Sequence, residues 1–267
     1  MTYRGLMMIF LKDFFDGSSA FSNFEKYETA HMLVFCLLAA AVMLMVIFKD
    51  RITPQMDRTF KVGATALTMV LELGWHVWNY RNGYNFVGNL IYLDLCAITL
   101  ILAYIFNLSK KGSIAKKVFP LVYFWSVGAI SSILFPALSH GPDKFRFYHF
   151  FWVHGYIVLT ALYGTIVNGH RIDIKDYWKT LKTSVVFGVF VGTVDKLFGQ
   201  NYMFLAGPPD TATPLDNLGD GPVYYLNLLL LSAFFLFLVY LPHWFKDAVD
   251  KRAIARMMFI EVEEEWV

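Results

Sequence analysis

Long apolar runs, separated by short polar segments, recur along the whole chain. Seven of them predict membrane-spanning helices, at residues 29–48, 59–80, 86–106, 118–138, 147–168, 180–198 and 222–245. A helix needs about 20 residues to cross a hydrocarbon core of about 30 Å, since each residue adds about 1.5 Å. The predicted fold class is therefore all-α, a polytopic membrane protein built as a bundle of seven transmembrane helices. The sixth run has the weakest pattern, because it ends at Asp195 and Lys196.

The first 28 residues form a separate segment, whose short apolar run is interrupted by Lys12, Asp13 and Asp16. The apolar region of a signal peptide does not tolerate such charges. An amphipathic segment on the membrane surface is predicted instead, with a buried side made of Leu6, Met7, Phe10 and Phe14. The chain then divides into an interfacial segment (1–28), a membrane domain (29–245) and a cytoplasmic tail (246–267).

Composition supports a membrane protein. Hydrophobic residues make up 57% of the 267 positions and charged residues 16%, whereas soluble proteins are about half apolar and about a quarter charged. The net charge is +2, and no basic cluster with interleaved aromatic residues is present, which argues against nucleic acid as a partner. We expect a multi-pass protein of a bacterial plasma membrane, with the lipid bilayer as its partner; the sequence does not specify an oligomeric state.

The orientation follows from the distribution of Lys and Arg. The N-terminal segment and the loops on its side of the membrane hold six of these residues, whereas the opposite loops and the C-terminal tail hold fourteen. Because cytoplasmic loops are enriched in Lys and Arg, the N-terminus is predicted to be outside and the C-terminus cytoplasmic. Seven helices also invite comparison with retinal proteins, but 222–245 lacks the buried lysine that a Schiff base requires.

The two cysteines, Cys36 and Cys96, both fall inside predicted spans, so a disulfide framework is not expected. No CxxC, HExxH, Walker or GxGxxG pattern occurs. The sequence therefore implies no metal site and no cofactor. Cys36 is interpreted as a packing residue.

Ionisable groups inside a membrane are costly and are functional candidates by default. Counted along the predicted helices, Cys96 would lie roughly 15 Å and His154 roughly 11 Å below the outer surface. Other polar residues also fall in outer halves of their helices, which predicts one pocket that opens outward. These residues are Glu72, His76, His149, Asp195 and Asn227.

Two pairs within this set suggest chemistry. Glu72 and His76 are four residues apart and share a helix face, as expected for a carboxylate that holds an imidazole or, with less support, for two metal ligands. Asp94 and Cys96 point about 200° apart, so only one of them faces the pocket squarely. A thiol becomes a nucleophile when a base removes its proton, which favours Cys96 with His154 as the base. The alternatives are a thiol that merely packs and a histidine that bonds between helices.

The loop between the last two predicted helices, "GQNYMFLAGPPDTATPLDNLGDGP", is long and rich in Pro, Gly and Asp. Long ordered loops often act as lids or binding loops. Four apolar residues, Tyr202 to Leu205, are expected to turn back toward the mouth of the bundle.

Three segments, "YLDLCAITLILA", "FRFYHFFWVHGYIVLTALYGTI" and "NYMFLAGPPDTATPLDNLGDGPVYYLN", resemble the YwaF-like integral membrane family, which is related to transmembrane protein 164. The resemblance implies a lipid acyltransferase that moves a fatty-acyl chain between phospholipids, with Cys96 as nucleophile and His154 as base. Many members carry histidine two residues before the cysteine, where this chain has Asp94. An ionised carboxylate would oppose a thiolate there, so Asp94 is either protonated or orients a histidine.

The resulting hypothesis is acyl transfer, or ester hydrolysis, on membrane lipids through a cysteine thioester. The residues expected to bind substrate or to support the catalytic pair are Glu72, His76, Asp94, His149, Asp195, Tyr202 and Asn227. A proton-coupled or small-solute transporter would use several of the same groups as a relay, although polar groups confined to the outer half argue against it. A membrane protein that binds lipid without reacting is the third reading.

Overall fold

The computed structural model describes residues 12–17, 24–83, 93–110, 112–209 and 212–264, with side chains through residue 250. The helices in this part of the chain are α2 (Thr29–Phe48), α3 (Pro54–Arg81), α5 (Leu95–Leu108), α6 (Ser113–Leu134), α7 (Phe145–Ile166), α8 (Ile174–Phe198) and α9 (Gly221–Glu264). Short 3-10 turns occupy Lys49–Arg51, Tyr202–Phe204 and Pro214–Asn217. The described residues form no strand, which confirms the all-α prediction.

Each predicted span coincides with one of these helices, but not all of the helices have the character of a span. Within the described residues, three are long and apolar enough to cross a membrane: Thr29–Arg51, Ile114–Leu134 and Gly221–Asp250. A fourth helix, α5, is apolar but only 14 residues long. The chain is therefore a helical membrane protein, and the count of seven spans and the orientation of the termini stay predictions.

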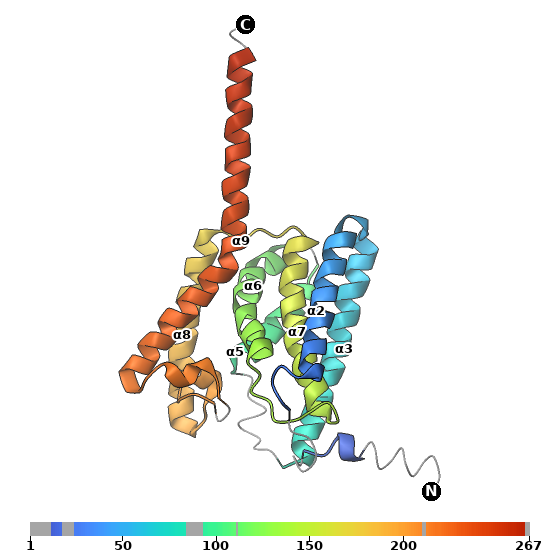
Figure 1. The fold of residues 1–267 in the computed structure, drawn as a ribbon, viewed down its shortest axis with the longest axis vertical. Helices are drawn as coiled ribbons and strands as arrows, with labels where there is room; N and C mark the ends of the chain where they lie inside the picture. The colour runs from blue at the N-terminus through green and yellow to red at the C-terminus, as the bar shows by residue number, and fades with distance from the viewer. Residues whose placement is uncertain (1–11, 18–23, 84–92, 111, 210–211, 265–267) are drawn as a thin grey trace, which may run out of the picture.

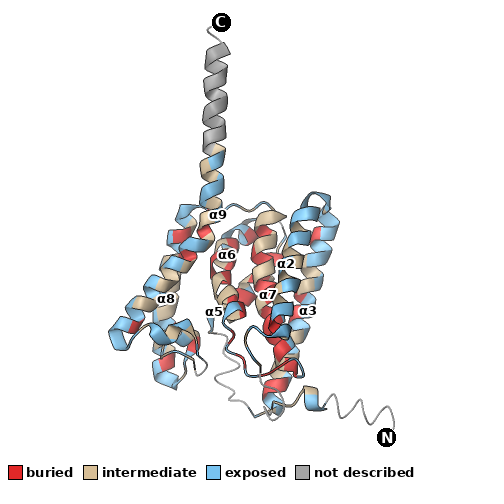
Figure 2. Cartoon of the chain, in the orientation of Figure 1, coloured by how far each residue is buried: buried red, intermediate tan, exposed pale blue. Residues whose placement is uncertain are grey.

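Helices α5, α6 and α7 pack together in the centre, with α2 and α3 against α7 on one side (Figure 1). Helices α8 and α9 pack against each other and against α6 on the other side. Figure 2 shows that the buried residues concentrate on α6 and α7, while α8 and α9 are largely exposed. Phe119, Val122 and Phe124 of α6 and Ile157 of α7 are almost fully buried and form the centre of this core.

Several helix boundaries differ from the prediction by four to six residues, and two differ by more. Helix α5 begins at Leu95, not at residue 86, because Asp94 has an extended backbone (φ −65°, ψ 144°). The depth predicted for Cys96 counted residues 86–94 as helix, which does not hold at Asp94; residues 86–92 lie outside the described part, so the depth stays a prediction. Helix α9 continues past residue 245 to Glu264. The charges after 245 end the apolar run, but Ala, Lys, Arg, Met and Glu still favour a helix.

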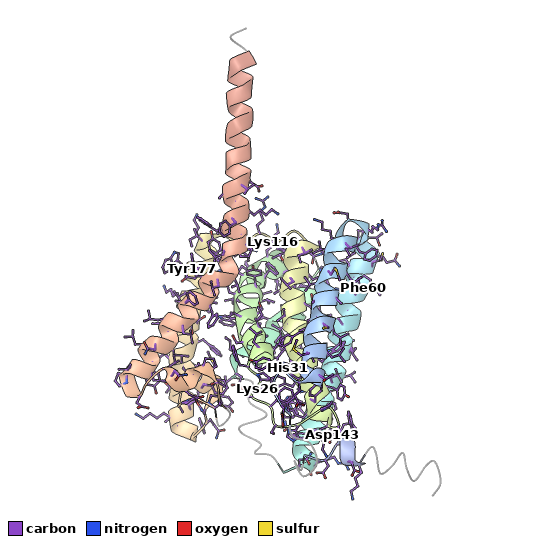
Figure 3. All side chains as sticks on the ribbon, in the orientation of Figure 1. Lys26, His31, Phe60, Lys116, Asp143 and Tyr177 are labelled. Atoms are coloured by element: carbon purple, nitrogen blue, oxygen red, sulfur yellow. The ribbon has the colours of Figure 1, made fainter. Side chains whose placement is uncertain are left out.

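Histidine His31 joins α2 to α6 in a way that the sequence pattern did not indicate. Its side chain is fully buried; its Nε2 donates to the carbonyl of Ile133 at 2.8 Å, and its Nδ1 accepts from the backbone of Tyr27 at 3.0 Å. Figure 3 labels it near Lys26, among side chains that fill the space between the helices. With both ring nitrogens used in these bonds, His31 has a structural role.

The described part of the N-terminal segment, residues 12–17, lies against the ends of α3 and α7. Lys144 donates to the carbonyl of Asp13 at 3.0 Å, and the amide of Gly17 donates to Asn82 Oδ1 at 2.7 Å. The ring of Phe15 stacks on Phe145 at 5.0 Å. The remaining residues predicted to face the membrane, Leu6, Met7 and Phe10, fall outside the described part.

Candidate functional site

Cys96 is the second residue of α5. The first helical hydrogen bond runs from the amide of Ile98 to the carbonyl of Asp94, at 3.0 Å. The amides of Leu95, Cys96 and Ala97 therefore have no partner within the helix, as at any helix N-terminus. No described residue accepts from them either. Three N–H donors, at the positive end of the helix dipole, thus lie beside the thiol.

The residue before these amides, Asp94, bonds a different segment. Aspartate at this position usually accepts from an amide of the first turn, but the Asp94 side chain makes no capping hydrogen bond. Its Oδ1 accepts instead from the amide of Met203, in the loop between α8 and α9, at 3.1 Å. Asp94 is therefore a link between two segments, not a carboxylate buried within a helix.

The Cys96 thiol lies between α5 and α6. Its Sγ is 4.0 Å from Ser132 Oγ, and the half-buried side chain packs against the main core. Gly128 of α6 faces the first turn of α5, since a Cβ atom there would come within 3.2 Å of Leu95 Cδ2 and 3.5 Å of Sγ. Cys36 is exposed on α2, so its predicted role in packing the core is wrong.

The His154 imidazole has a defined tautomer. Its Nδ1 lies 2.7 Å from the carbonyl of Phe150, and a carbonyl can only accept, so Nδ1 carries the proton. The Nε2 atom then keeps its lone pair, and no described residue donates a hydrogen bond to it. The thiol and the imidazole do not hydrogen-bond to each other in this structure, so their pairing stays a prediction.

Glu72 bonds an imidazole of α7, and its predicted pairing with His76 stays a prediction. Its Oε1 accepts from His149 Nε2 of α7 at 2.6 Å, whereas His76 lies half-buried one turn further along α3. Arg146 donates to His149 Nδ1 at 3.0 Å. Because a guanidinium can only donate, this contact places the histidine proton on Nε2. The side chain of Glu72 thus links α3 to α7.

Aromatic rings surround the hydrogen-bonded side chains of Glu72, His149 and Arg146. Trp75 stacks on the His149 ring at 5.0 Å, and the guanidinium of Arg146 lies 4.1 Å from the centre of the Trp75 ring. His149 is buried, so its orientation is fixed by packing as well as by hydrogen bonds. Across the described ranges, no three His, Cys, Asp or Glu side chains gather as metal ligands.

Polar contacts continue along α3 and α7 well beyond the predicted pocket. Thr68 accepts from the Trp152 indole at 3.0 Å, and Thr65 bonds the hydroxyl of Tyr156 at 2.7 Å. Further along, Asn168 donates to Asp57 at 2.8 Å. The polar contacts between these helices therefore extend beyond the residues predicted to line the pocket. The spacing of three to four residues between the α3 members was a signal that could have revealed this interface.

The turn at Tyr202–Phe204 folds back onto the bundle, as the sequence predicted. The Tyr202 side chain is buried, and its amide donates to Asp195 Oδ1 at 2.9 Å. Met203 and Phe204 have left-handed backbone angles, with φ of 54° and 57°, which are strained for residues other than glycine. The hydroxyl of Tyr224 holds the turn by donating to the carbonyl of Phe204 at 2.7 Å.

The structure thus places the predicted site residues in separate groups. Asp195 and Tyr202 meet at the turn, together with the Asp94 that precedes Cys96. Asn227 donates to the carbonyl of Leu218 at 3.0 Å and fastens the end of the same loop to α9. The candidates on α3 and α7 form the other group: Glu72, His76, His149 and His154.

A family model described as the TMEM164 family matches residues 22–240 of the chain. The matched region includes every helix from α2 to α8 and the first half of α9. No curated protein and no solved structure matches the chain.

Proposed function

The chain belongs to the TMEM164 family, and from its geometry we propose that it is a membrane-embedded acyltransferase that moves a fatty-acyl chain between membrane lipids. The observation that carries the proposal is the position of Cys96. A nucleophilic side chain stands on the first turn of a helix whose first amides no described residue caps, and the side chain of Asp94 bonds the loop. Thiol nucleophiles at helix N-termini are favoured by the local dipole.

The proposed reaction has two halves. In the first, His154 Nε2 takes the thiol proton, and Cys96 Sγ attacks the carbonyl carbon of a lipid ester. The carbon–oxygen bond breaks, the alkoxide leaves with the proton from His154, and a thioester remains. In the second half, His154 removes the proton from a lysolipid hydroxyl, whose oxygen attacks the thioester and restores the thiol. Water in place of the lysolipid would make the reaction a hydrolysis.

The amides of α5 supply the stabilisation that each half requires. Attack on an ester or thioester carbonyl puts negative charge on its oxygen, and preorganised N–H donors beside the nucleophile lower the energy of that state. The amides of Cys96 and Ala97 are suited to this role, since both lack a partner among the described residues. No cofactor takes part in this scheme, because the acyl donor is a lipid of the membrane itself.

Two groups around the pair act as positioning residues in the proposal. Ser132 is the described hydrogen-bonding group nearest the thiol and orients its proton. The Glu72–His149–Arg146 chain fixes the outer part of α7 against α3, and so holds the helix that carries His154. The lipid is proposed to enter sideways from the outer leaflet.

The test uses the purified full chain in lipid nanodiscs that contain a phospholipid with an isotope-labelled acyl chain. We expect labelled acyl chain on the Cys96 peptide by mass spectrometry, sensitive to hydroxylamine as a thioester is. The adduct should vanish in Cys96→Ala and fall at least a hundredfold in rate in His154→Gln, in line with loss of a general base. Cys36→Ala is the matched control and should react normally.

The result that rules out this mechanism is acyl transfer that continues in Cys96→Ala. Absence of any adduct or transfer in the wild-type chain, over a panel of donor and acceptor lipids, would favour the lipid-binding reading.

A further inference from the structure

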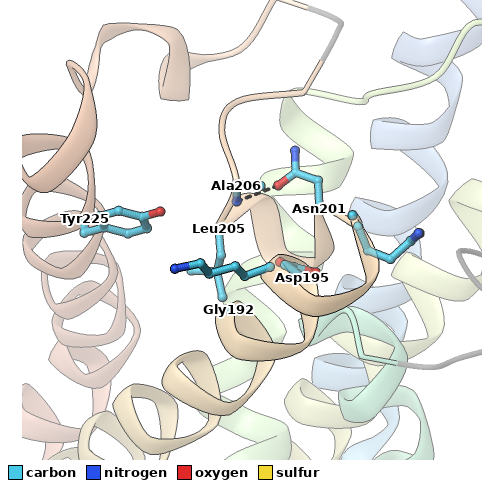
Figure 4. A pocket seen from close by; sticks show the side chains of 9 residues that line it. Gly192, Asp195, Asn201, Leu205, Ala206 and Tyr225 are labelled. Carbon is cyan, nitrogen blue, oxygen red and sulfur yellow. Dashed lines mark hydrogen bonds between the residues drawn. The ribbon is translucent and has the colours of Figure 1, made fainter.

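A cleft of about 730 Å³ opens between the end of α8, the loop that follows it and the first turns of α9 (Figure 4). No residue with a role in the proposed reaction lines this cleft. Its lining combines a carboxylate, an ammonium group and two amides with apolar and aromatic surface: Gly192, Asp195, Lys196, Gly199, Gln200, Asn201, Leu205, Ala206 and Tyr225.

One atom of this lining lacks a hydrogen bond. Asp195 is only 3% exposed, and its Oδ1 accepts from the amide of Tyr202. Its other oxygen, Oδ2, is buried and has no partner among the described residues. Buried carboxylate oxygens are almost always hydrogen-bonded, because leaving one without a donor costs free energy. The oxygen therefore lacks a donor that a molecule in the cleft could supply.

The two amide side chains of the lining are already engaged within the protein. Asn201 accepts from the amide of Ala206 and donates to the carbonyl of Gly207, as Figure 4 shows for the first bond. Gln200 donates to the carbonyl of Phe198. These residues shape the wall of the cleft, so recognition of a ligand depends on Asp195 and its neighbour.

That neighbour is Lys196, which is exposed and makes no hydrogen bond or ion pair within the part of the chain that the structure describes. A hydrogen-bond acceptor and a cation therefore lie side by side in one cleft. A ligand that satisfies both carries an anionic group next to an N–H or O–H donor. The headgroup of a phospholipid has this arrangement, since its phosphate is followed by a short polar substituent.

We propose that this cleft binds the headgroup of a phospholipid whose substituent carries a hydrogen-bond donor, with the donor on Asp195 and the phosphate on Lys196. Ethanolamine and glycerol headgroups meet this requirement, whereas choline has no N–H or O–H. The inference rests on the proposed function, which makes the substrate a lipid. It adds the position of the headgroup and the headgroups that the cleft excludes.

The cleft borders the start of α5 through a shared turn. Asp195 holds the amide of Tyr202 from the side of the cleft, and Asp94 holds the amide of Met203 from the side of Cys96. Tyr202–Phe204 therefore forms the partition between headgroup and thiol. A headgroup in the cleft leaves the ester-linked chains next to the bundle, on the side where α5 begins.

The binding test uses the full chain in detergent, with lysophospholipids that share one acyl chain and differ in headgroup. Native mass spectrometry would compare ethanolamine, glycerol and choline forms. We expect the first two to bind at least tenfold more tightly than the choline form, since a hydrogen bond to a charged group supports a difference of this size. Inorganic phosphate at millimolar concentration should not displace them, which separates a lipid site from a site for free phosphate.

Two variants locate the selectivity. Asp195→Asn keeps an acceptor for the amide of Tyr202 but places an NH₂ donor where Oδ2 was, so it should abolish the preference over choline. Lys196→Gln should weaken all three lysolipids by a similar factor. The matched controls, Asp220→Asn and Lys182→Gln, change exposed groups away from the cleft and should bind like the wild type. Thermal unfolding checks that each variant is folded.

Equal affinity of the wild-type chain for all three headgroups would overturn the inference, whether or not the variants fold. So would selectivity that survives in a folded Asp195→Asn variant, or displacement by inorganic phosphate. The headgroup site and the proposed reaction can be tested independently. Cys96→Ser should retain headgroup selectivity. Selective binding without any acyl transfer would support the headgroup site and rule out the reaction.

Discussion

At the residue scale, the hydrogen bond of Asp94 decides what the first turn of α5 can do. Its backbone has the extended conformation of a capping residue, yet its carboxylate bonds the amide of Met203. In this structure the carboxylate holds the loop and makes no capping hydrogen bond to the helix. The strained turn of the loop is therefore coupled to the availability of the amides next to Cys96.

Gly128 provides a test of the packing around the thiol. A Cβ atom there would come within 3.2 Å of Leu95 Cδ2 and 3.5 Å of the Cys96 Sγ. Because Leu95 has to shift, we expect Gly128→Ala to lower the free energy of unfolding by about 1 kcal/mol, measured by denaturant titration in detergent. The matched control is Gly63→Ala, where a Cβ atom meets nothing within 4 Å. This change should be stabilising or neutral through helix propensity alone. Equal responses of the two variants would contradict the packing described around Cys96.

His140, in the loop between α6 and α7, predicts a pH dependence. Burial lowers the pKa of His140 below its usual value, and the nearby Arg146 and Lys144 act in the same direction, against a bond to the carbonyl of Gly17 and the charge of Asp143. Below pH of about 6.5 the unfolded chain therefore binds this proton more readily than the folded chain. The stability that depends on neutral His140 is present above that pH and is lost as the pH falls toward the lowered pKa.

The measurement is hydrogen exchange at the amide of Gly17, which lies beside the His140 contact and donates to Asn82. After correction for the intrinsic rate, its protection should fall between pH 7 and pH 5 in the wild type. In His140→Gln the protection should be lower and nearly independent of pH over this range. A wild-type protection that does not change with pH would contradict the role given to His140.

At the element scale, α3 and α7 are joined by a row of polar pairs as much as by apolar packing. Such hydrogen bonds between membrane helices contribute modestly, about 0.6 kcal/mol on average and up to about 1.7 kcal/mol. The hydroxyl of Tyr156 stands at the centre of the row, since it bonds Thr65 and also accepts from Asn107 at 2.9 Å. Tyr156 therefore stabilises the contact among three helices.

We expect Tyr156→Phe to lower the free energy of unfolding by about 1 kcal/mol, because two buried groups lose their shared partner. Tyr148→Phe is the control, since its side chain is half exposed on the same helix. That change should have an effect near zero. Unfolding of both variants would be compared by denaturant titration in the same detergent.

The sequence predicted the helices well, because apolar runs of sufficient length leave few alternatives in a membrane. It placed the start of α2 at the residue where the structure has it, and α7 within two residues at each end. It did not predict the start of α5, since the apolar run continues across the Asp94 backbone. It also did not reveal the bond between Glu72 and His149, because periodicity shows which residues share a face of one helix but not which side chain of another helix stands opposite.

At the scale of the whole molecule, the proposed lipid entry depends on the orientation of the bundle. Lys116, before the core of α6, and Asp143, before α7, lie toward opposite ends of the helices (Figure 3). Both side chains are exposed; Lys116 lies in the first turn of α6, and Asp143 lies in the loop that joins α6 to α7. They therefore form a matched pair for a test of topology.

In a chain with Cys36 and Cys96 replaced by serine, we expect Asp143→Cys to react with a membrane-impermeant maleimide on intact cells. Lys116→Cys should react only after the cells are permeabilised, because the Lys and Arg distribution assigns its loop to the cytoplasm. Expression and thermal unfolding of both variants would be measured, so that a difference in folding is not mistaken for a difference in accessibility. Labelling of Lys116→Cys alone on intact cells would show that the orientation is opposite to the predicted one. The thiol, the strained turn and the headgroup cleft would then face the inner leaflet.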